Sequence, residues 1–204
     1  MLAEKLVGNL KQRHYEAFFY HTAQEAVEKI TGMIPEGSSV TWGGSMTIRD
    51  MGLTRALHNK EGLDIWDRDL APDREAAQEI YRRAFYADYY LSSVNAMSED
   101  GEIVNIDGRG NIVAAITFGP KKVILAVGAN KLVLDEKDAV DRIKNDACPP
   151  NCISLGLKTP CAVTGKCGNC LSRGNTVFCH TVTTRFSFED DRLHVVLINE
   201  NLGF

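Results

Sequence analysis

The chain has 204 residues, of which 44% are hydrophobic and 25% charged, and its formal net charge is −4 at pH 7. Such a composition is typical of a globular protein with one substantial core, so we expect a single domain over residues 1–204. There is no basic block and no apolar run near the ~20 residues of a membrane span, which argues against nucleic-acid and membrane partners. The N-terminus carries charge at once and lacks an apolar signal core, which predicts a cytoplasmic protein.

Helical and strand-like segments alternate along the first two thirds of the chain. Apolar periodicity and capping residues predict helices over residues 2–16, from Thr22 to Pro35, from Thr47 to about Leu57, over 74–86, from Asn111, and over 137–147, where Pro149 and Pro150 stop the helix. Short apolar runs predict strands at residues 18–20, 39–42, 63–66, 89–92, 103–106 and 123–127. Alternation of this kind favours a mainly parallel sheet flanked by helices.

The last part of the chain has a different pattern. Residues 181–187 and 193–199 flank an acidic turn at residues 189–191, which predicts a C-terminal hairpin at an antiparallel edge. The segment 148–180 is rich in cysteine and is expected to form a loop. The predicted fold class is therefore α/β, a mainly parallel sheet with helices on its faces, a C-terminal hairpin and a Cys-rich loop.

A glycine-rich loop follows the strand predicted at residues 39–42. Its glycines let backbone N–H groups approach a ligand, and a capped helix start favours an anion such as a carboxylate or phosphate. Ligands of open α/β sheets lie beyond the carboxyl ends of strands, where this loop is expected. The alternative is a plain tight turn with a helix cap. The candidate ligand-binding residues here are Trp42, which is expected to form an apolar wall, Gly43, Gly44, Ser45, Met46 and Thr47.

A second loop of the same kind lies between the strand predicted at residues 103–106 and the helix from Asn111. Asp107 and Asn111 are expected to hydrogen-bond a small anionic molecule, and Arg109 to pair with its charge. The alternative is a turn made of its usual residues, with Arg109 solvated. The candidate ligand-binding residues are Asn105, Asp107, Gly108, Arg109, Gly110 and Asn111.

All six cysteines lie between Cys148 and Cys179, which in a reducing compartment favours a metal or redox site over disulfides. The C-x2-C pair at Cys167 and Cys170 suits one metal ion, and the flanking chain can bring in Cys161 and Cys179. Four thiolates suit zinc and also a [4Fe–4S] iron–sulfur cluster. The alternative is a set of free buried thiols.

The remaining candidates near this segment are weaker. Cys148 and Cys152 have a C-x3-C spacing, which we interpret as buried helix-end cysteines rather than extra ligands or a redox pair. His180 adjoins Cys179. We interpret it as an ordinary strand residue, and the alternative is a substitute metal ligand. No nucleophilic triad or Walker loop is present in the sequence, so no catalytic residue is assigned.

Several stretches together resemble the LUD domain of lactate-utilisation proteins (DUF162-type), from near the start of the chain to its end. They are Thr41-Trp42-Gly43-Gly44-Ser45-Met46-Thr47, Val104-Asn105-Ile106-Asp107-Gly108-Arg109-Gly110-Asn111, Gly119-Pro120-Lys121-Lys122-Val123-Ile124, Gly128-Ala129-Asn130-Lys131, Gly156-Leu157-Lys158-Thr159-Pro160-Cys161 and Thr164-Gly165-Lys166-Cys167. The resemblance implies a fold like that of ribose-5-phosphate isomerase and the CoA-transferases. It also implies L-lactate oxidation to pyruvate beside iron–sulfur oxidoreductase partner proteins, which favours iron–sulfur over zinc.

Two features set this chain apart from relatives and leave alternatives open. It lacks the long iron–sulfur-binding extensions of larger members, and no residue matches the glutamate nucleophile of CoA-transferases. We therefore expect a subunit or accessory factor of hydroxy-acid oxidation, an oxidoreductase component, with a homo-oligomer as one expected assembly. The alternatives are a non-catalytic ligand-binding regulatory module with structural zinc and a sugar-phosphate isomerase or transferase-like enzyme.

Overall fold

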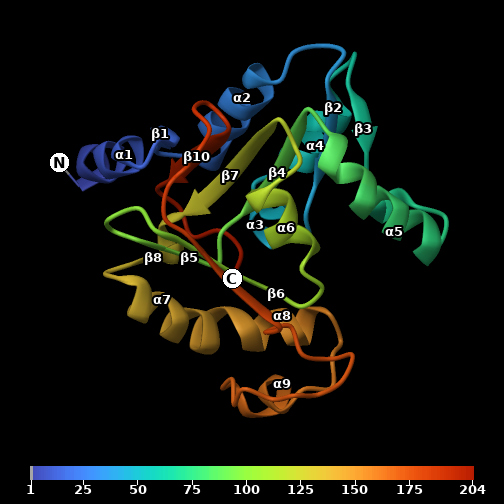
Figure 1. Ribbon diagram of the computed structural model, residues 1–204, viewed down its shortest axis with the longest axis vertical. Helices are drawn as coiled ribbons and strands as arrows, with labels where there is room; N and C mark the ends of the chain where they lie inside the picture. The colour runs from blue at the N-terminus through green and yellow to red at the C-terminus, as the bar shows by residue number, and fades with distance from the viewer. Residues whose placement is uncertain (1) are drawn as a thin grey trace.

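The computed structural model describes residues 2–204, and its centre is a six-stranded sheet in which every strand pair is parallel (Figure 1). This result confirms the predicted α/β class. Continuous apolar runs build the inner strands because both faces of the sheet are covered by helices. In spatial order the strands are β1 (Glu16–Tyr20), β10 (Leu193–Ile198), β7 (Lys122–Gly128), β4 (Tyr89–Ser93), β2 (Ser39–Trp42) and β3 (Asp64–Trp66).

A second, four-stranded sheet lies beside the first. Its order is β8 (Leu132–Val133), β5 (Ala96–Ser98), β6 (Ile103–Asp107) and β9 (His180–Thr184). The predicted C-terminal hairpin is wrong, because β9 pairs antiparallel with β6 while β10 lies between β1 and β7 in the other sheet. Apart from His194, β10 is a continuous apolar run, as expected of a central strand, and burial of both its faces outweighs the local turn signal.

The helices lie close to the predicted ranges, with three corrections. The helix predicted over residues 2–16 ends at Gln12, because His14 has φ +61° and β1 begins at Glu16. Gly52 has φ +78°, which ends one short helix and starts another instead of allowing a single helix to Leu57. Pro149 and Pro150 do not stop the chain's helical path, because they occupy the first turn of a new helix, where a missing N–H is tolerated. The α-helices are α1 (Leu2–Gln12), α2 (Ala23–Met33), α3 (Met46–Asp50), α4 (Leu53–His58), α5 (Arg74–Arg83), α6 (Asn111–Thr117), α7 (Glu136–Arg142), α8 (Cys148–Ser154) and α9 (Pro160–Thr164).

Successive side chains of the central strands point to opposite faces of the sheet and pack in two separate core clusters. Val195 and Leu197 of β10 pack in the cluster that also holds residues of α1 and α6, whereas Val196 and Ile198 pack in the one beneath α2, α3 and α4. A third, smaller cluster joins the second sheet to α7 and includes Cys148. Figure 1 shows α7 and α8 along the outer side of the second sheet, with α9 beyond them.

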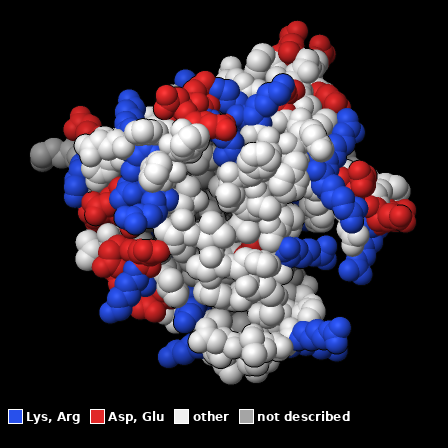
Figure 2. All heavy atoms as spheres, in the orientation of Figure 1, with Lys and Arg blue, Asp and Glu red and all other residues white. Residues whose placement is uncertain are grey.

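The surface agrees with the charge balance of the sequence. Figure 2 shows Lys and Arg side chains interspersed with Asp and Glu around the rim of the face that it presents, with no large area of one sign. Within residues 2–204, none of the helices has the length and apolar character needed to cross a membrane.

Candidate functional site

The first glycine loop lies at the carboxyl end of β2 and is crowded from three sides. The Gly43 N–H donates to the Leu91 carbonyl at 3.0 Å, which extends the pairing of β2 with β4. A Cβ atom on Gly43 would lie 2.7 Å from the Tyr90 hydroxyl and 3.1 Å from the Ile112 side chain. A side chain at this position would therefore collide with its neighbours, which explains why the loop needs glycine here.

The residues after the glycines are engaged with the protein itself. The Ser45 hydroxyl accepts from the Ile48 N–H at 3.5 Å and thereby caps α3. Thr47 is buried, and its hydroxyl donates to the Leu202 carbonyl at 3.2 Å, so the C-terminal segment crosses this helix. Met46 is half-buried. Gly44 is exposed and is the part of the loop that remains open to a ligand.

Trp42 lies in the core and not on the surface of the loop. Its side chain belongs to the cluster beneath α2, α3 and α4. The ring packs edge-on against His58, with 5.6 Å between the ring centroids. His58 Nε2 in turn lies 3.0 Å from Asp67 Oδ2. The structure thus places Trp42 behind the loop, where it supports the backbone.

The second glycine loop follows β6, which belongs to the other sheet, yet it meets the first loop through Ile112. Its carboxylate, on Asp107, is buried and accepts from the N–H groups of Arg109 at 3.0 Å, Ile112 at 2.7 Å and Val113 at 3.2 Å. These bonds satisfy backbone donors at the start of α6. The acceptor positions of Asp107 are therefore directed at its own loop.

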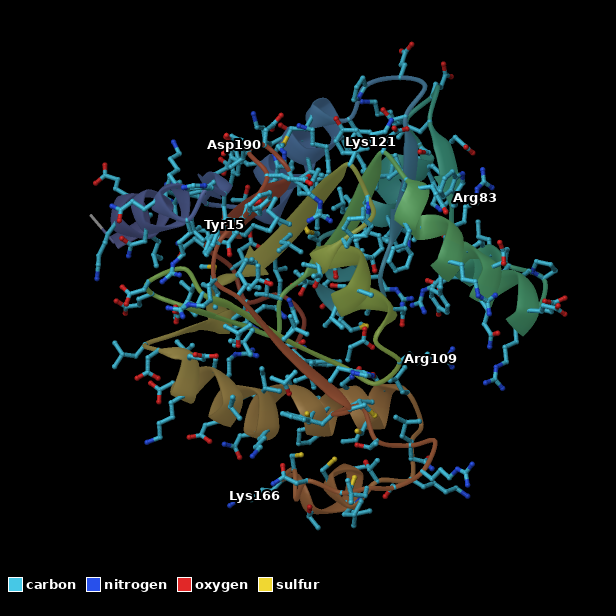
Figure 3. The ribbon with its side chains drawn as sticks, in the orientation of Figure 1. Tyr15, Arg83, Arg109, Lys121, Lys166 and Asp190 are labelled. Carbon is cyan, nitrogen blue, oxygen red and sulfur yellow. The ribbon has the colours of Figure 1, made fainter. Side chains whose placement is uncertain are left out.

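The other predicted ligand residues of this loop divide into structural and exposed ones. The buried Asn105 side chain accepts from the Asn95 N–H at 3.1 Å. The backbone of Gly108 lies against Thr176 and Val177, and Gly110, at φ +83°, lies 3.3 Å from the His180 ring, measured from its Cβ position. Asn111 is the half-buried first residue of α6. Arg109 is exposed, and Figure 3 shows it on the connection between β6 and α6.

Arg68, which the sequence analysis missed, is the charged side chain nearest the open glycine. It lies just after β3, and its Nη2 atom would be 2.8 Å from a Cβ on Gly44. Nη1 donates to the Tyr81 hydroxyl at 2.5 Å, and Nη2 lies 3.6 Å from Asp69. The Nε atom is buried and makes no hydrogen bond within the described part of the chain. The signal that would have found Arg68 is its position beyond the carboxyl end of a strand.

The pKa values of Arg68 and Tyr90, which lie beside the first glycine loop, are both raised. Burial disfavours the Arg68 cation, but the Tyr81 hydrogen bond and the nearby Asp69 outweigh burial and raise the pKa of Arg68. Burial also raises the pKa of Tyr90, with a smaller contribution from Asp107. A guanidinium and the neutral phenol of Tyr90 therefore lie beside the loop, and this set favours an anion.

A buried lysine lies in the Gly128-Ala129-Asn130-Lys131 motif. Lys131 is only 3% exposed, and its Nζ donates to the Phe204 carbonyl at 2.6 Å. Burial and the neighbouring Arg142 lower the pKa of Lys131 to about 7, against a smaller opposing effect of Asp50. The amine is therefore close to its titration point at neutral pH, a property common among functional lysines.

The four cysteines predicted as metal ligands are only partly brought together. Cys161 is buried, and its sulfur lies 3.2 Å from the Thr159 hydroxyl. Cys167 is half-buried and packs against the third core cluster, which contains Cys148. Cys170 is half-buried and close enough to Cys152 to affect its pKa.

Cys179 differs from the other predicted ligands. It is exposed, and its sulfur lies 3.6 Å from the Thr176 carbonyl. Among residues 2–204, no three Cys, His, Asp or Glu side chains are arranged around a single point as metal ligands would be. The structure therefore does not bring the four predicted ligands together as a metal site within the described residues.

The interpretation of Cys148 and Cys152 as buried helix-end cysteines is confirmed as to burial, since each is 1% exposed on α8. Burial and the neighbouring thiols raise the pKa of both cysteines. By contrast, hydrogen bonds from Ser172 lower the pKa of Cys170. His180 is the first residue of β9 and lies against Gly110, which ties the end of the Cys-rich segment to the second glycine loop.

A family model described as the LUD domain matches residues 3–198. The chain belongs to the LUD domain family. The predicted family is thereby confirmed, and it is one related to lactate utilisation. No curated protein matches this LUD protein.

Several solved structures are similar to this chain over different shares of its length. This LUD protein is similar to the crystal structure of a DUF162 family protein from Deinococcus radiodurans, at 12% identity and a TM-score of 0.57, with 97% of this chain and 96% of that chain covered. Ribose 5-phosphate isomerase from Plasmodium falciparum is similar over 55% of this chain and 52% of that chain, at 12% identity and a TM-score of 0.36. eIF2B delta from Chaetomium thermophilum is similar over 67% and 54%, at 13% identity and a TM-score of 0.38.

Proposed function

We propose that this LUD protein binds a small carboxylate over Gly44 and takes part in the oxidation of L-lactate, or a related hydroxy acid, as a subunit or accessory factor. That oxidation to pyruvate removes two electrons and two protons from the substrate. The electrons need an acceptor, which in this proposal is an iron–sulfur oxidoreductase partner or a thiolate-bound cluster in the Cys-rich segment. Membership of a family related to lactate utilisation supports the choice of substrate class.

One observation carries the anion-binding part of the proposal. The buried Nε of Arg68 has no hydrogen-bond partner among residues 2–204, and this side chain lies beside the exposed glycine of a loop at the carboxyl edge of the sheet. An unsatisfied buried donor costs about 1–3 kcal/mol, so a ligand that accepts from it recovers that cost. A carboxylate suits the planar guanidinium, because its two oxygens accept from two N–H groups at once.

The test is calorimetric titration of L-lactate and of pyruvate into the wild type and into Arg68→Met. We expect Arg68→Met to bind at least tenfold more weakly, since a hydrogen-bonded charge pair contributes about 1.5–3 kcal/mol. Arg83→Met is the matched control: Arg83 also lies near the end of β3, where it covers the Trp66 ring at 3.8 Å, but it is half-exposed and does not contact Gly44.

Equal affinities of wild type and Arg68→Met, or no binding of either acid to the wild type at millimolar concentration, would exclude the proposed anion site. Binding of the acid with no electron transfer to an added iron–sulfur acceptor would instead favour the alternative of a regulatory module. The redox role and the anion site are thus tested by separate measurements.

A further inference from the structure

The connection between β9 and β10, on which Figure 3 labels Asp190, presents two aromatic rings to solvent. Phe186 is 57% exposed and Phe188 is 93% exposed, whereas Ser187 between them is only 3% exposed. This pattern places both rings on the outer side of the connection and Ser187 on its inner side. Exposed apolar side chains that lie together often mark a surface that contacts another molecule.

Residues 185–189, called the contact strip below, are held in place by hydrogen bonds. The Ser187 N–H donates to the Arg13 carbonyl at 2.9 Å, and the Ser187 hydroxyl donates to the Glu189 carbonyl at 2.7 Å. Arg13 Nη1 also donates to the Arg185 carbonyl at 2.6 Å. From the strip, these bonds use main-chain groups and the Ser187 hydroxyl. The four outward side chains of the strip are therefore not needed to hold it, and its order is already fixed before any partner binds.

A groove of about 520 Å³ lies beside the contact strip. Its walls include Ile116, Phe118 and Val182 as well as the strip itself. Phe118 directly follows α6 and is 75% exposed, so apolar surface continues from the strip to the opposite wall of the groove. The projecting ring of Phe188 and an apolar groove therefore lie on the same face of the molecule.

The two ends of the contact strip carry opposite charges. Arg185, with a side chain that is 74% exposed, begins the strip, and the exposed Glu189 ends it. The order Arg-Phe-Ser-Phe-Glu is complementary to itself when it is reversed. Across a two-fold axis at Ser187, Arg185 of one copy faces Glu189 of the other, and Phe186 faces Phe188. A partner of one charge would match only one end of the strip, whereas a second copy of this chain matches both.

We propose that two copies of this protein associate through this face, with their contact strips antiparallel about a two-fold axis and Phe188 of each copy seated in the groove of the other. The strip and the groove walls together comprise 13 residues. A standard stable interface has roughly 20–30 residues a side, so we expect a dimer with a dissociation constant in the micromolar range. The face shares no residue with the proposed anion site at Gly44 and Arg68, so the two proposals are tested independently.

The experiment is analytical ultracentrifugation of the full chain over about 1–300 µM, a range that spans the expected dissociation constant. A reductant is present, so that the exposed Cys179 cannot link two copies by a disulfide. Phe188→Asp should raise the dissociation constant at least tenfold, because it places a charge in the apolar centre of the interface. Leu171→Asp is the matched control: Leu171 is 95% exposed but lies outside the strip and the groove, and this change should leave association unaltered.

Charge exchange tests the two-fold arrangement itself. Arg185→Glu and Glu189→Arg should each weaken the dimer about threefold or more at low salt, because like charges then face each other at both ends of the strip. The double variant restores opposite charges and should associate as the wild type does. Both positions anchor the strip through main-chain carbonyls, so the folded chain tolerates these changes.

Three results would overturn the proposal. The first is a wild type that stays monomeric over the whole concentration range. The second is a dimer that Phe188→Asp leaves intact, since the copies would then meet through another face. The third is a double charge variant that associates no better than the single ones, because the strips would then not lie antiparallel about Ser187. None of these results bears on the titration of L-lactate into Arg68→Met.

Discussion

Single residues of the candidate site differ in whether their hydrogen bonds are already complete. The carboxylate of Asp107 accepts from three backbone N–H groups, whereas Arg68 keeps one buried donor that no group in the described part of the chain accepts from. A side chain with complete bonds gains little from a ligand, while an unsatisfied one gains the full bond. At this scale Arg68 is the stronger candidate for recognition of an anion, and Asp107 is a structural residue.

Lys131 gives a prediction about pH at the same scale. Its pKa is lowered to about 7 in the folded chain, against 10.5 for the ordinary amine, so between these values the unfolded chain binds more protons. The free energy of unfolding should therefore rise as the pH increases from about 7 towards 10, and the penalty for the charged amine is fully present below 7. Relative to Lys131→Met, the wild type should gain roughly 2 kcal/mol between pH 7 and pH 9.

Urea unfolding of both proteins at several pH values measures this difference. Groups that titrate equally in both proteins, such as the other lysines and the tyrosines, cancel in the comparison. Parallel stability curves for wild type and Lys131→Met would show that the buried amine does not titrate in this range.

Among the elements, two short helices, α4 and α6, begin directly after a glycine with positive φ. Gly52 divides the helix predicted up to Leu57, and Gly110 ends the second glycine loop at the start of α6. Both have positive φ, which L-residues with a side chain adopt at a cost. The position of such glycines decides how α3, α4 and α6 approach the edge of the sheet, and so where the two loops meet.

Gly110→Ala should therefore destabilise the protein by about 1–2 kcal/mol, because the new methyl group meets both the positive φ and the His180 ring at 3.3 Å. Gly32→Ala is the matched control, since Gly32 lies within α2 with nothing within 4 Å of its Cβ position. That change should stabilise the protein by about 0.5–1 kcal/mol. Urea unfolding measures both, and a Gly110→Ala variant as stable as wild type would show that the loop adapts freely.

For the whole molecule, the central position of β10 connects the ends of the chain to its middle. This C-terminal strand pairs with β1 near the N-terminus on one side and with β7 on the other. Its side chains also enter the two large core clusters on opposite faces of the sheet. Loss of packing on either face should therefore weaken the same cooperative unit.

Leu125→Ala and Leu57→Ala test this cooperativity, since the two leucines are fully buried in different clusters. Each change should lower the free energy of unfolding by about 2–5 kcal/mol, because it leaves a cavity in a packed core. Thermal unfolding followed by calorimetry should still show one transition for each variant. A separate transition for either face of the sheet would contradict a single folding unit.

The amino-acid sequence by itself determined the α/β class, most strands and the family, because apolar periodicity and glycine-rich turns are local signals. It also marked both glycine loops and the cysteines. Only the tertiary structure decided that β10 is a central strand, that Arg68 reaches Gly44 and that Cys167 packs against the core cluster containing Cys148. Those relations join residues far apart along the chain or across a helix face, and they arise from burial of both sides of the sheet, which no short stretch of sequence records.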